Sequence, residues 1–335
     1  MTKADAAAAI LWVGATFYAL FGGADFGGGF WDLTAGWDDE RGQRPRDVIQ
    51  RSLTPVWEAN HVWLIFVLVV LWTAFPPAFS AIFTTLYVPI ALAAFGIVLR
   101  GAGFAFRKSI VGLRERRAMG ATFAVSSVLT PFFMGAVVGT IAAGNVPAEG
   151  NGDAFSSWLA PLPLLIGAMF VASGAYLAAV FLVGDARRGG DEEMERYFER
   201  RALGAAVVAG AFALAGLVAL HSEARYVFDR LTAEGLPLVI VSLLCGVALL
   251  AVLLRGRHRL LRPLAAGAVI AVIWGWGVAQ FPYLLPTSLR IDQAAAPDAT
   301  MTIVFIVFAV AAVVVLPSLG LLYTLAQKDL LEAEH

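Results

Sequence analysis

Four ionisable residues lie within or beside long apolar runs of this 335-residue chain: Asp25, Glu58, His61 and Arg100. Ionisable side chains inside membrane segments are energetically costly, so by default they indicate a functional site. Glu58 and His61 are spaced i, i+3 and would share one face of a helix. A half-buried carboxylate and an imidazole both titrate near neutral pH, so this pair could pass protons.

The remaining candidates support this pair. Arg100 could hold the carboxylate of Glu58 or Asp25 ionised, because a nearby opposite charge favours the charged form. Polar and aromatic residues surround Glu58 in the segment 55–64 (PVWEANHVWL), which makes Trp57, Asn60 and Trp63 supporting candidates. The alternative is that these charges reach water at a membrane interface or form salt bridges that pin helix ends. The residues alone leave both interpretations open.

Histidine and cysteine give little support for a metal or haem site on this chain. His61 is in an apolar run, whereas His221 lies at the outer end of a predicted span, His258 in a basic loop and His335 at the terminus. A haem held by two histidines is therefore not favoured. The single cysteine, Cys245, excludes an intrachain disulfide and any cysteine cluster. We expect no cofactor or metal to bind directly.

The composition indicates a protein that is solvated by lipid. Hydrophobic residues make up 59% of the chain and charged residues 15%. Soluble domains have about 45–50% apolar and about 25% charged residues. A net charge of −1 supplies no basic excess for binding nucleic acid. These values exclude an ordinary soluble enzyme and a nucleic-acid-binding protein.

The elements that must position the candidate residues are long apolar runs, which predict nine membrane helices of about 20 residues each. The predicted spans cover residues 7–28, 54–74, 78–99, 119–143, 158–183, 202–221, 236–254, 263–284 and 302–326. The longest hydrophilic segments are 30–53 and 185–200. The predicted fold class is therefore an all-α integral membrane protein with one membrane domain, 1–335.

Basic residues predict the orientation of these spans. Only Lys3, Arg225, Arg230 and Arg290 fall on one side, which leaves 20 of the 24 Lys and Arg residues on the other. Cytoplasmic loops carry the excess of Lys and Arg in membrane proteins. We therefore expect the N-terminus outside and the C-terminus in the cytoplasm. This topology places the four ionisable candidates at the cytoplasmic side.

An aromatic segment ends the eighth predicted span, at residues 274–283 (WGWGVAQFPY). An aromatic belt at the membrane interface and a bend at proline explain it in structural terms. A quinone or a lipid headgroup could also use this patch, and Gln280 could bond across helices. The glycine run 27–29 lacks the Lys-Ser/Thr of a phosphate-binding loop and is better explained by close helix contact.

Five of these segments, taken in order, resemble subunit II of the cytochrome bd quinol oxidases. Segment 22–27 (GGADFG) is similar to the family's Gly- and Asp-containing segment that ends span 1. Segment 55–64 is similar to its Pro-Val-Trp-Asp-Gly-Asn-Glu-Val-Trp-Leu motif. Segment 100–107 (RGAGFAFR) matches an Arg-x-x-Gly-Phe-x-aromatic-Arg pattern, and 281–288 (FPYLLPTS) and 321–324 (LLYT) follow near the end. The resemblance runs the length of the chain.

The resemblance implies a fold and an assembly. The family's fold is two four-helix bundles plus one peripheral helix, here the pseudo-repeat halves 1–143 and 158–284 and a ninth helix at 302–326. Subunit II carries no haem and pairs with a homologous subunit I, which holds the haems and the quinol site. The complex oxidises quinol and reduces dioxygen to water in the bacterial inner membrane. Membrane lipids and a structural quinone are further expected partners, and nucleic acid is not.

The resemblance also implies a role for Glu58, which matches the carboxylate that the family associates with a cytoplasmic proton route. This chain has Glu in place of Asp at 58, Ala in place of Gly at 59 and His in place of Glu or Gln at 61. We expect the route to use Glu58, His61 and Asp25. The alternatives are a proton-coupled secondary transporter, which also carries buried carboxylates and pseudo-repeats, and a purely structural scaffold for subunit I.

Overall fold

The computed structural model describes the chain except residues 1, 36–39, 54–56, 108–112, 257–258 and 328–335. Its elements are α1 (Lys3–Phe17), η1 (Tyr18–Gly22), α2 (Gly23–Thr34), α3 (Glu40–Leu53), α4 (Trp57–Ala74), α5 (Pro76–Thr85), α6 (Tyr87–Arg107), α7 (Leu113–Ala142), α8 (Pro161–Arg188), α9 (Glu192–Glu223), α10 (Arg225–Thr232), α11 (Leu236–Leu254), α12 (Leu261–Gln280), β1 (Tyr283–Leu285), β2 (Leu289–Arg290), α13 (Ile291–Ala294) and α14 (Asp298–Gln327).

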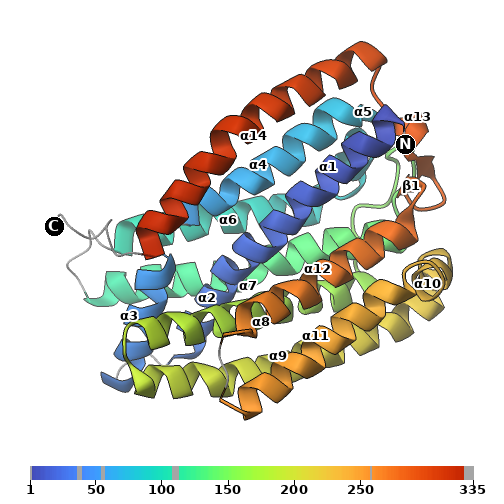
Figure 1. Ribbon diagram of the computed structural model, residues 1–335. Coiled ribbons are helices and arrows are strands. Elements are labelled where there is room, and N and C mark those ends of the chain that lie inside the picture. The colour runs from blue at the N-terminus through green and yellow to red at the C-terminus, as the bar shows by residue number, and fades with distance from the viewer. Residues whose placement is uncertain (1, 36–39, 54–56, 108–112, 257–258, 328–335) are drawn as a thin grey trace.

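The long helices run side by side between two ends of an elongated bundle (Figure 1). One end carries α3 and the turn between α8 and α9, and we call it the α3 end. The other end carries α5, α10, the two short antiparallel strands and α13, and we call it the α5 end. Helix α2 packs against α7 and α8, α6 against α7, α8 against α9, and α11 against α12.

The bundle has apolar side chains outside as well as inside, as expected for lipid as the solvent. The membrane-length segments of α11 and α14 have only 6% of their residues buried. Leu254 on α11 and Val313 on α14 are each 75% exposed. In the described part of the chain, seven helices are long and apolar enough to cross a membrane, or eight if the bent pair α4–α5 is one span. The all-α membrane fold is therefore confirmed.

The first predicted span, 7–28, is part of a longer continuous path from Lys3 to Thr34. Helix α1 begins with a capping box, in which Thr2 accepts from the backbone of Asp5 and the Asp5 carboxylate accepts from the backbone of Thr2. Between α1 and α2 lies η1, a single π-helical turn over Tyr18–Gly22. Such wide turns occur inside α-helices and often lie at functional sites. Asp25 follows this turn in the first turn of α2.

The prediction of one span over 78–99 was wrong, because the structure divides these residues between α5 and α6. Helices α4 and α5 meet at Phe75 with a bend of 116°. Phe75 leaves the helical conformation (φ −135°, ψ 59°) because Pro76 disfavours a helical residue before it. A second break follows at Leu86, since the ring of Pro89 would clash with the carbonyl of Thr85 four residues earlier. Each break is therefore explained by a proline that lies within an apolar segment.

Two further boundaries differ from the predictions. The hydrophilic segment 185–200 is almost entirely helical, because α8 continues to Arg188 and α9 begins at Glu192. Gly190 links them with a φ of +70°, a conformation that favours glycine. The predicted span 263–284 is too long, because α12 ends at Gln280 and β1 begins at Tyr283.

Candidate functional site

A buried ion pair between α2 and α6 forms the centre of the site. An Nη2 atom of Arg100 lies 2.7 Å from Oδ1 of Asp25, and the side chains of these residues are 2% and 0% exposed. The same nitrogen donates to the backbone carbonyl of Asp25 at 3.2 Å. The second carboxylate oxygen, Oδ2, is buried without a hydrogen-bond partner in the described part of the chain. The pair therefore keeps one acceptor open.

Helix α7 completes the surroundings of Arg100. Nη1 of Arg100 donates to Ser127 Oγ at 3.0 Å, and Ser127 in turn donates to the carbonyl of Phe123 at 2.6 Å. The guanidinium carbon also lies 4.9 Å from the ring centre of Phe26 and 4.6 Å from that of Phe123. Aromatic faces attract a desolvated cation. Arg100 is thus held by a carboxylate, a hydroxyl and two aromatic rings.

Close packing of α2 fixes Asp25 in this position. A Cβ atom added at Gly27 would overlap the backbone carbonyl of Gly174 on α8, so only glycine permits this approach. On the other side of the helix, a Cβ atom at Gly29 would overlap Ser127. The glycine run therefore serves close helix contact, as the sequence indicates, and brings α2 against both α7 and α8.

The other predicted residues lie on α4. The ring of His61 makes an edge contact with Phe26, 6.1 Å between ring centres, and His61 also interacts electrostatically with Asp25. Trp63 points to a different neighbour, because its ring stacks on Phe17 of α1 at 4.4 Å. Trp57, Glu58 and Asn60 lie in the first turn of α4, and their side chains are outside the described part of the structure.

A second ion pair on α2 was missed by the sequence analysis. Nε of Arg46 on α3 lies 3.4 Å from Oδ1 of Asp32, and the side chains are 11% and 4% exposed. Both residues fall in the segment 30–53, which was predicted only as a hydrophilic loop. The available signal was the spacing of Asp32 seven residues after Asp25, which places both carboxylates on one helix face.

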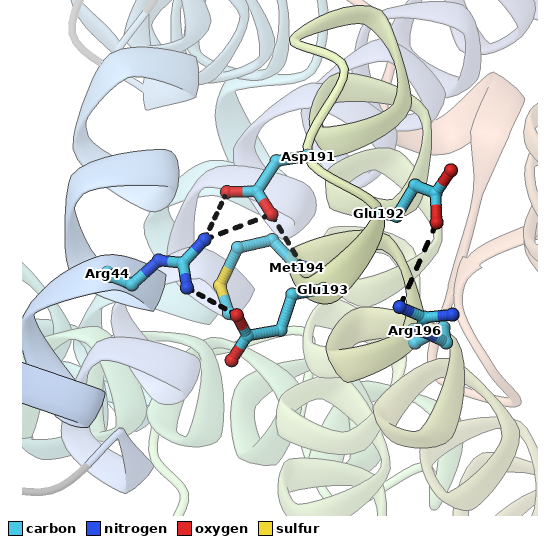
Figure 2. A network of polar contacts seen from close by, with 6 residues as sticks. All are labelled: Arg44, Asp191, Glu192, Glu193, Met194 and Arg196. Carbon is cyan, nitrogen blue, oxygen red and sulfur yellow. Dashed lines mark hydrogen bonds and ion pairs between the residues drawn. The ribbon is translucent and has the colours of Figure 1, made fainter.

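The α3 helix is held at the α3 end by a network of polar contacts (Figure 2). Arg44 of α3 pairs with Asp191, at 3.1 Å, and with Glu193, and Asp191 caps α9 by accepting from the backbone N–H of Met194. That backbone hydrogen bond is the main reason why the pKa of Asp191 lies below its ordinary value, and Arg44 adds to it. Val48 and Ile49 of α3 are buried in the core shared with α8 and α9. Both polar and apolar contacts therefore dock α3.

The aromatic segment at the end of α12 packs into the protein at two points. Trp12 of α1 donates to the carbonyl of Ile273 at 3.0 Å, and its ring lies 5.0 Å from Trp276. In the described part of the chain, Nε2 of Gln280 donates within its own segment, to the backbone carbonyl of Leu284 at 2.6 Å, only four residues away. The use of this segment by a quinone or lipid stays a prediction.

These features define the class of protein: an integral membrane protein of many helices, with charged side chains paired deep between them. In the part of the chain that the structure describes, no group of three or more His, Cys, Asp or Glu residues could hold a metal ion. Among the described residues, the carboxylate of Asp25, the imidazole of His61 and the phenol of Tyr18, which interacts electrostatically with Asp25 and Arg100, are titratable groups in this centre.

Comparison with known proteins gives the family. The profile of the family described as cytochrome bd terminal oxidase subunit II matches residues 4–326. The chain is 20% identical over 339 residues to the putative cytochrome bd menaquinol oxidase subunit II of Bacillus subtilis, covering 98% of this chain and 96% of that protein. It is 28% identical over 226 residues to the cytochrome bd-I ubiquinol oxidase subunit 2 of Escherichia coli, covering 63% of this chain and 55% of that protein.

A solved structure agrees in fold. A chain of the bd oxidase from Geobacillus thermodenitrificans superimposes with a TM-score of 0.77 at 23% identity, covering 97% of this chain and 98% of that one. The chain belongs to the cytochrome bd terminal oxidase subunit II family. It is a subunit of a cytochrome bd quinol oxidase, an oxidoreductase complex, and a multi-pass protein of the bacterial inner membrane. The match does not favour the transporter alternative.

Proposed function

We propose that this chain is a haem-free subunit that supplies a cytoplasmic proton route to the oxygen-reducing site of its partner, subunit I. The partner holds the haems and oxidises quinol, and the chemistry there consumes protons when dioxygen is reduced to water. The observation that carries the proposal is the buried centre of Asp25, Arg100 and His61. A buried ion pair is weak evidence for stability, since desolvation can outweigh the attraction, so a functional reason for it is favoured.

The proposed route starts on α4 and ends at Asp25. Glu58 lies in the first turn of this helix and His61 is three residues further on, so both are on one face. His61 contacts the ring of Phe26 and interacts electrostatically with Asp25, the residue that precedes Phe26. A proton taken up by the Glu58 carboxylate would pass to His61 and then to Asp25, whose open oxygen Oδ2 accepts it. Arg100 holds Asp25 ionised between transfers.

We propose nine spans, formed by the path α1–α2 and by α4, α6, α7, α8, α9, α11, α12 and α14, with α5 lying outside the count. The four basic residues predicted on the outer side, Lys3, Arg225, Arg230 and Arg290, belong to elements of the α5 end, which supports an external α5 end and a cytoplasmic α3 end. The halves 1–143 and 158–284 would form the two four-helix bundles, with α14 peripheral. Reporter fusions after Arg188 and after Arg230 would lie on opposite sides.

The proposed partner and ligands follow from the family. The relatives are subunits of menaquinol and ubiquinol oxidases, and we propose a quinol as the substrate of the whole complex. The outward apolar faces of α11 and α14 suit lipid or subunit I. A lipid or a structural quinone at the aromatic end of α12 is part of the same proposal.

The test is Glu58→Gln in the chain co-expressed with its partner subunit. We expect quinol oxidase turnover to fall by about 100-fold, the usual contribution of a proton-transferring side chain, while haem content per complex is unchanged. Glu58→Asp keeps a carboxylate and should retain most of the activity. Normal turnover in Glu58→Gln would refute the proton role, and a parallel loss of haem would assign Glu58 to assembly and favour the scaffold alternative.

A further inference from the structure

Helix α2 carries a second buried carboxylate in line with Asp25. Asp32 is seven residues later, which is about 10.5 Å along the helix axis and within about 20° of the same face. It lies in the last turn of α2, the end of the helix that leads to α3, and its side chain is 4% exposed. A carboxylate buried in an apolar bundle is costly unless it is paired, and Asp32 is paired with Arg46 of α3.

The burial of the charged groups increases along this line. The side chain of Arg46 is 11% exposed, that of Asp32 is 4% exposed and that of Asp25 is 0% exposed. All three residues are buried, Arg46 the least, so they form a line from α3 to the buried centre. Protons that come from the cytoplasm need charged or titratable groups placed in such a line.

The face between the two carboxylates carries no bulky side chain of α2. Gly28 and Gly29 occupy the positions three and four residues after Asp25, so they flank the line from Asp25 to Asp32. Gly29 packs against Ser127, whose hydroxyl accepts from Arg100. The hydroxyl thus lies between the ion pair at Asp25 and the part of α2 that leads to Asp32.

Arg46 holds Asp32 from α3, the helix that Val48 and Ile49 dock against α8 and α9. The distance from Nε of Arg46 to Oδ1 of Asp32 is 3.4 Å, which is longer than the 2.7 Å between Nη2 of Arg100 and Oδ1 of Asp25. The guanidinium carbon of Arg201 on α9 lies 5.6 Å from the ring centre of Trp31 and 3.4 Å from that of Tyr197. Tyr197 also interacts electrostatically with Arg46. Arg46, Tyr197 and Arg201 are therefore charged or titratable groups of this end, in addition to the network of Arg44, Asp191 and Glu193.

We propose that Asp32 is the residue that takes up protons at the α3 end, ahead of Glu58, and supplies the route that leads through Glu58 and His61 to Asp25. Arg46 positions Asp32. This inference rests on the proposed function. In the step, Arg46 releases Asp32, a cytoplasmic hydronium ion protonates the Asp32 carboxylate, and one water molecule remains. The proton then passes through water to Glu58 and from there to the Asp25 centre, and Asp32 returns to its anionic form and pairs again with Arg46. One proton moves, and nothing is oxidised or reduced.

The experiment compares Asp32→Asn with Asp47→Asn in the complete complex. Asp47 is an exposed carboxylate on α3 next to Arg46, so it controls for loss of a negative charge at this end. We expect Asp32→Asn to lower turnover per haem by about 100-fold, to increase the rate ratio between H2O and D2O, and to leave haem content unchanged. Asp32→Glu should restore most of the rate, and Asp47→Asn should behave as the unmodified protein.

A double variant separates proton transfer from the effect of an unpaired buried charge. Asp32→Asn leaves Arg46 without its countercharge, whereas Asp32→Asn with Arg46→Gln removes both charges. If Asp32→Asn is slow only because Arg46 is left unpaired, the double variant should regain the rate; if Asp32 carries protons, it should stay as slow as the single variant. Recovery in the double variant, or a normal rate in Asp32→Asn, overturns the inference.

The same measurements distinguish this inference from the proposed function. A slow Glu58→Gln together with a normal Asp32→Asn would remove Asp32 from the route and leave the route intact. Normal rates in both variants would refute the proton route itself.

Discussion

Removing one member of the Asp25–Arg100 pair should destabilise the complex by an amount that depends on which charge is left. Arg100→Gln leaves the Asp25 carboxylate at 0% exposure without a cation, and Oδ2 already has no partner among the described residues. Breaking a buried pair in this way costs about 3–5 kcal/mol. Asp25→Asn should cost less, because Arg100 keeps Ser127, the backbone carbonyl of residue 25 and two aromatic faces.

The double variant, Asp25→Asn with Arg100→Gln, buries no charge and should be more stable than Arg100→Gln alone. Ser127→Ala is a smaller perturbation, which removes one hydrogen bond to a charged group and should cost about 1–3 kcal/mol. The assay is denaturant unfolding of the purified complex in one detergent, with the free energy of unfolding compared across the four variants. The reasoning is refuted if Asp25→Asn is less stable than Arg100→Gln, or if the double variant shows the sum of the single losses.

Two further predictions concern packing and the α3 contact. Gly27→Ala should destabilise the α2–α8 contact by about 1–3 kcal/mol, because its Cβ would overlap the carbonyl of Gly174; Gly204→Ala on α9, which has open space around it, is the matched control for complex yield and thermal stability. Because the pKa of Asp191 is lowered in the folded protein, its contribution is present above the ordinary value of 3.8 and is lost as pH falls through the lower folded value. The protection of the α3 amides, taken as the ratio of the intrinsic to the observed exchange rate at each pH, should therefore fall on acidification in the unmodified protein, and this dependence should be weaker in Asp191→Asn; an unchanged pH dependence of the protection would contradict the assignment.

The sequence predicts the membrane helices well where hydrophobicity and length agree. Helices α11 and α14 coincide with apolar runs that end in polar residues, and the fold class follows from them. It predicts the boundaries poorly where proline acts inside an apolar run. Pro76 and Pro89 are visible in the sequence, but their effect depends on whether the surrounding structure can accept a break there.

The candidate site, like the helices, was predictable from the sequence only in part. Topology predicts that Asp25 and Arg100 lie at the same side of the membrane, because both end their spans there. The rotation of α2, α6 and α7 about their axes decides which side chains meet. It determines that Arg100 pairs with Asp25 and that the other guanidinium nitrogen, Nη1, donates to Ser127. Asp32 was overlooked because polarity places it in a loop, although its spacing from Asp25 follows the helical repeat.

The single π-helical turn at Tyr18–Gly22 separates the angular settings of the two helices that it joins. A π turn holds about one residue more than an α turn, so it rotates everything after it by about 100° relative to an uninterrupted helix. Trp12 can thus face α12 while Asp25 faces α6, on one continuous path through the membrane. The π-helical turn therefore sets the rotation of α2 about its axis relative to α1. A one-residue change in its length would leave both helices intact and aim the carboxylates of α2 at different neighbours.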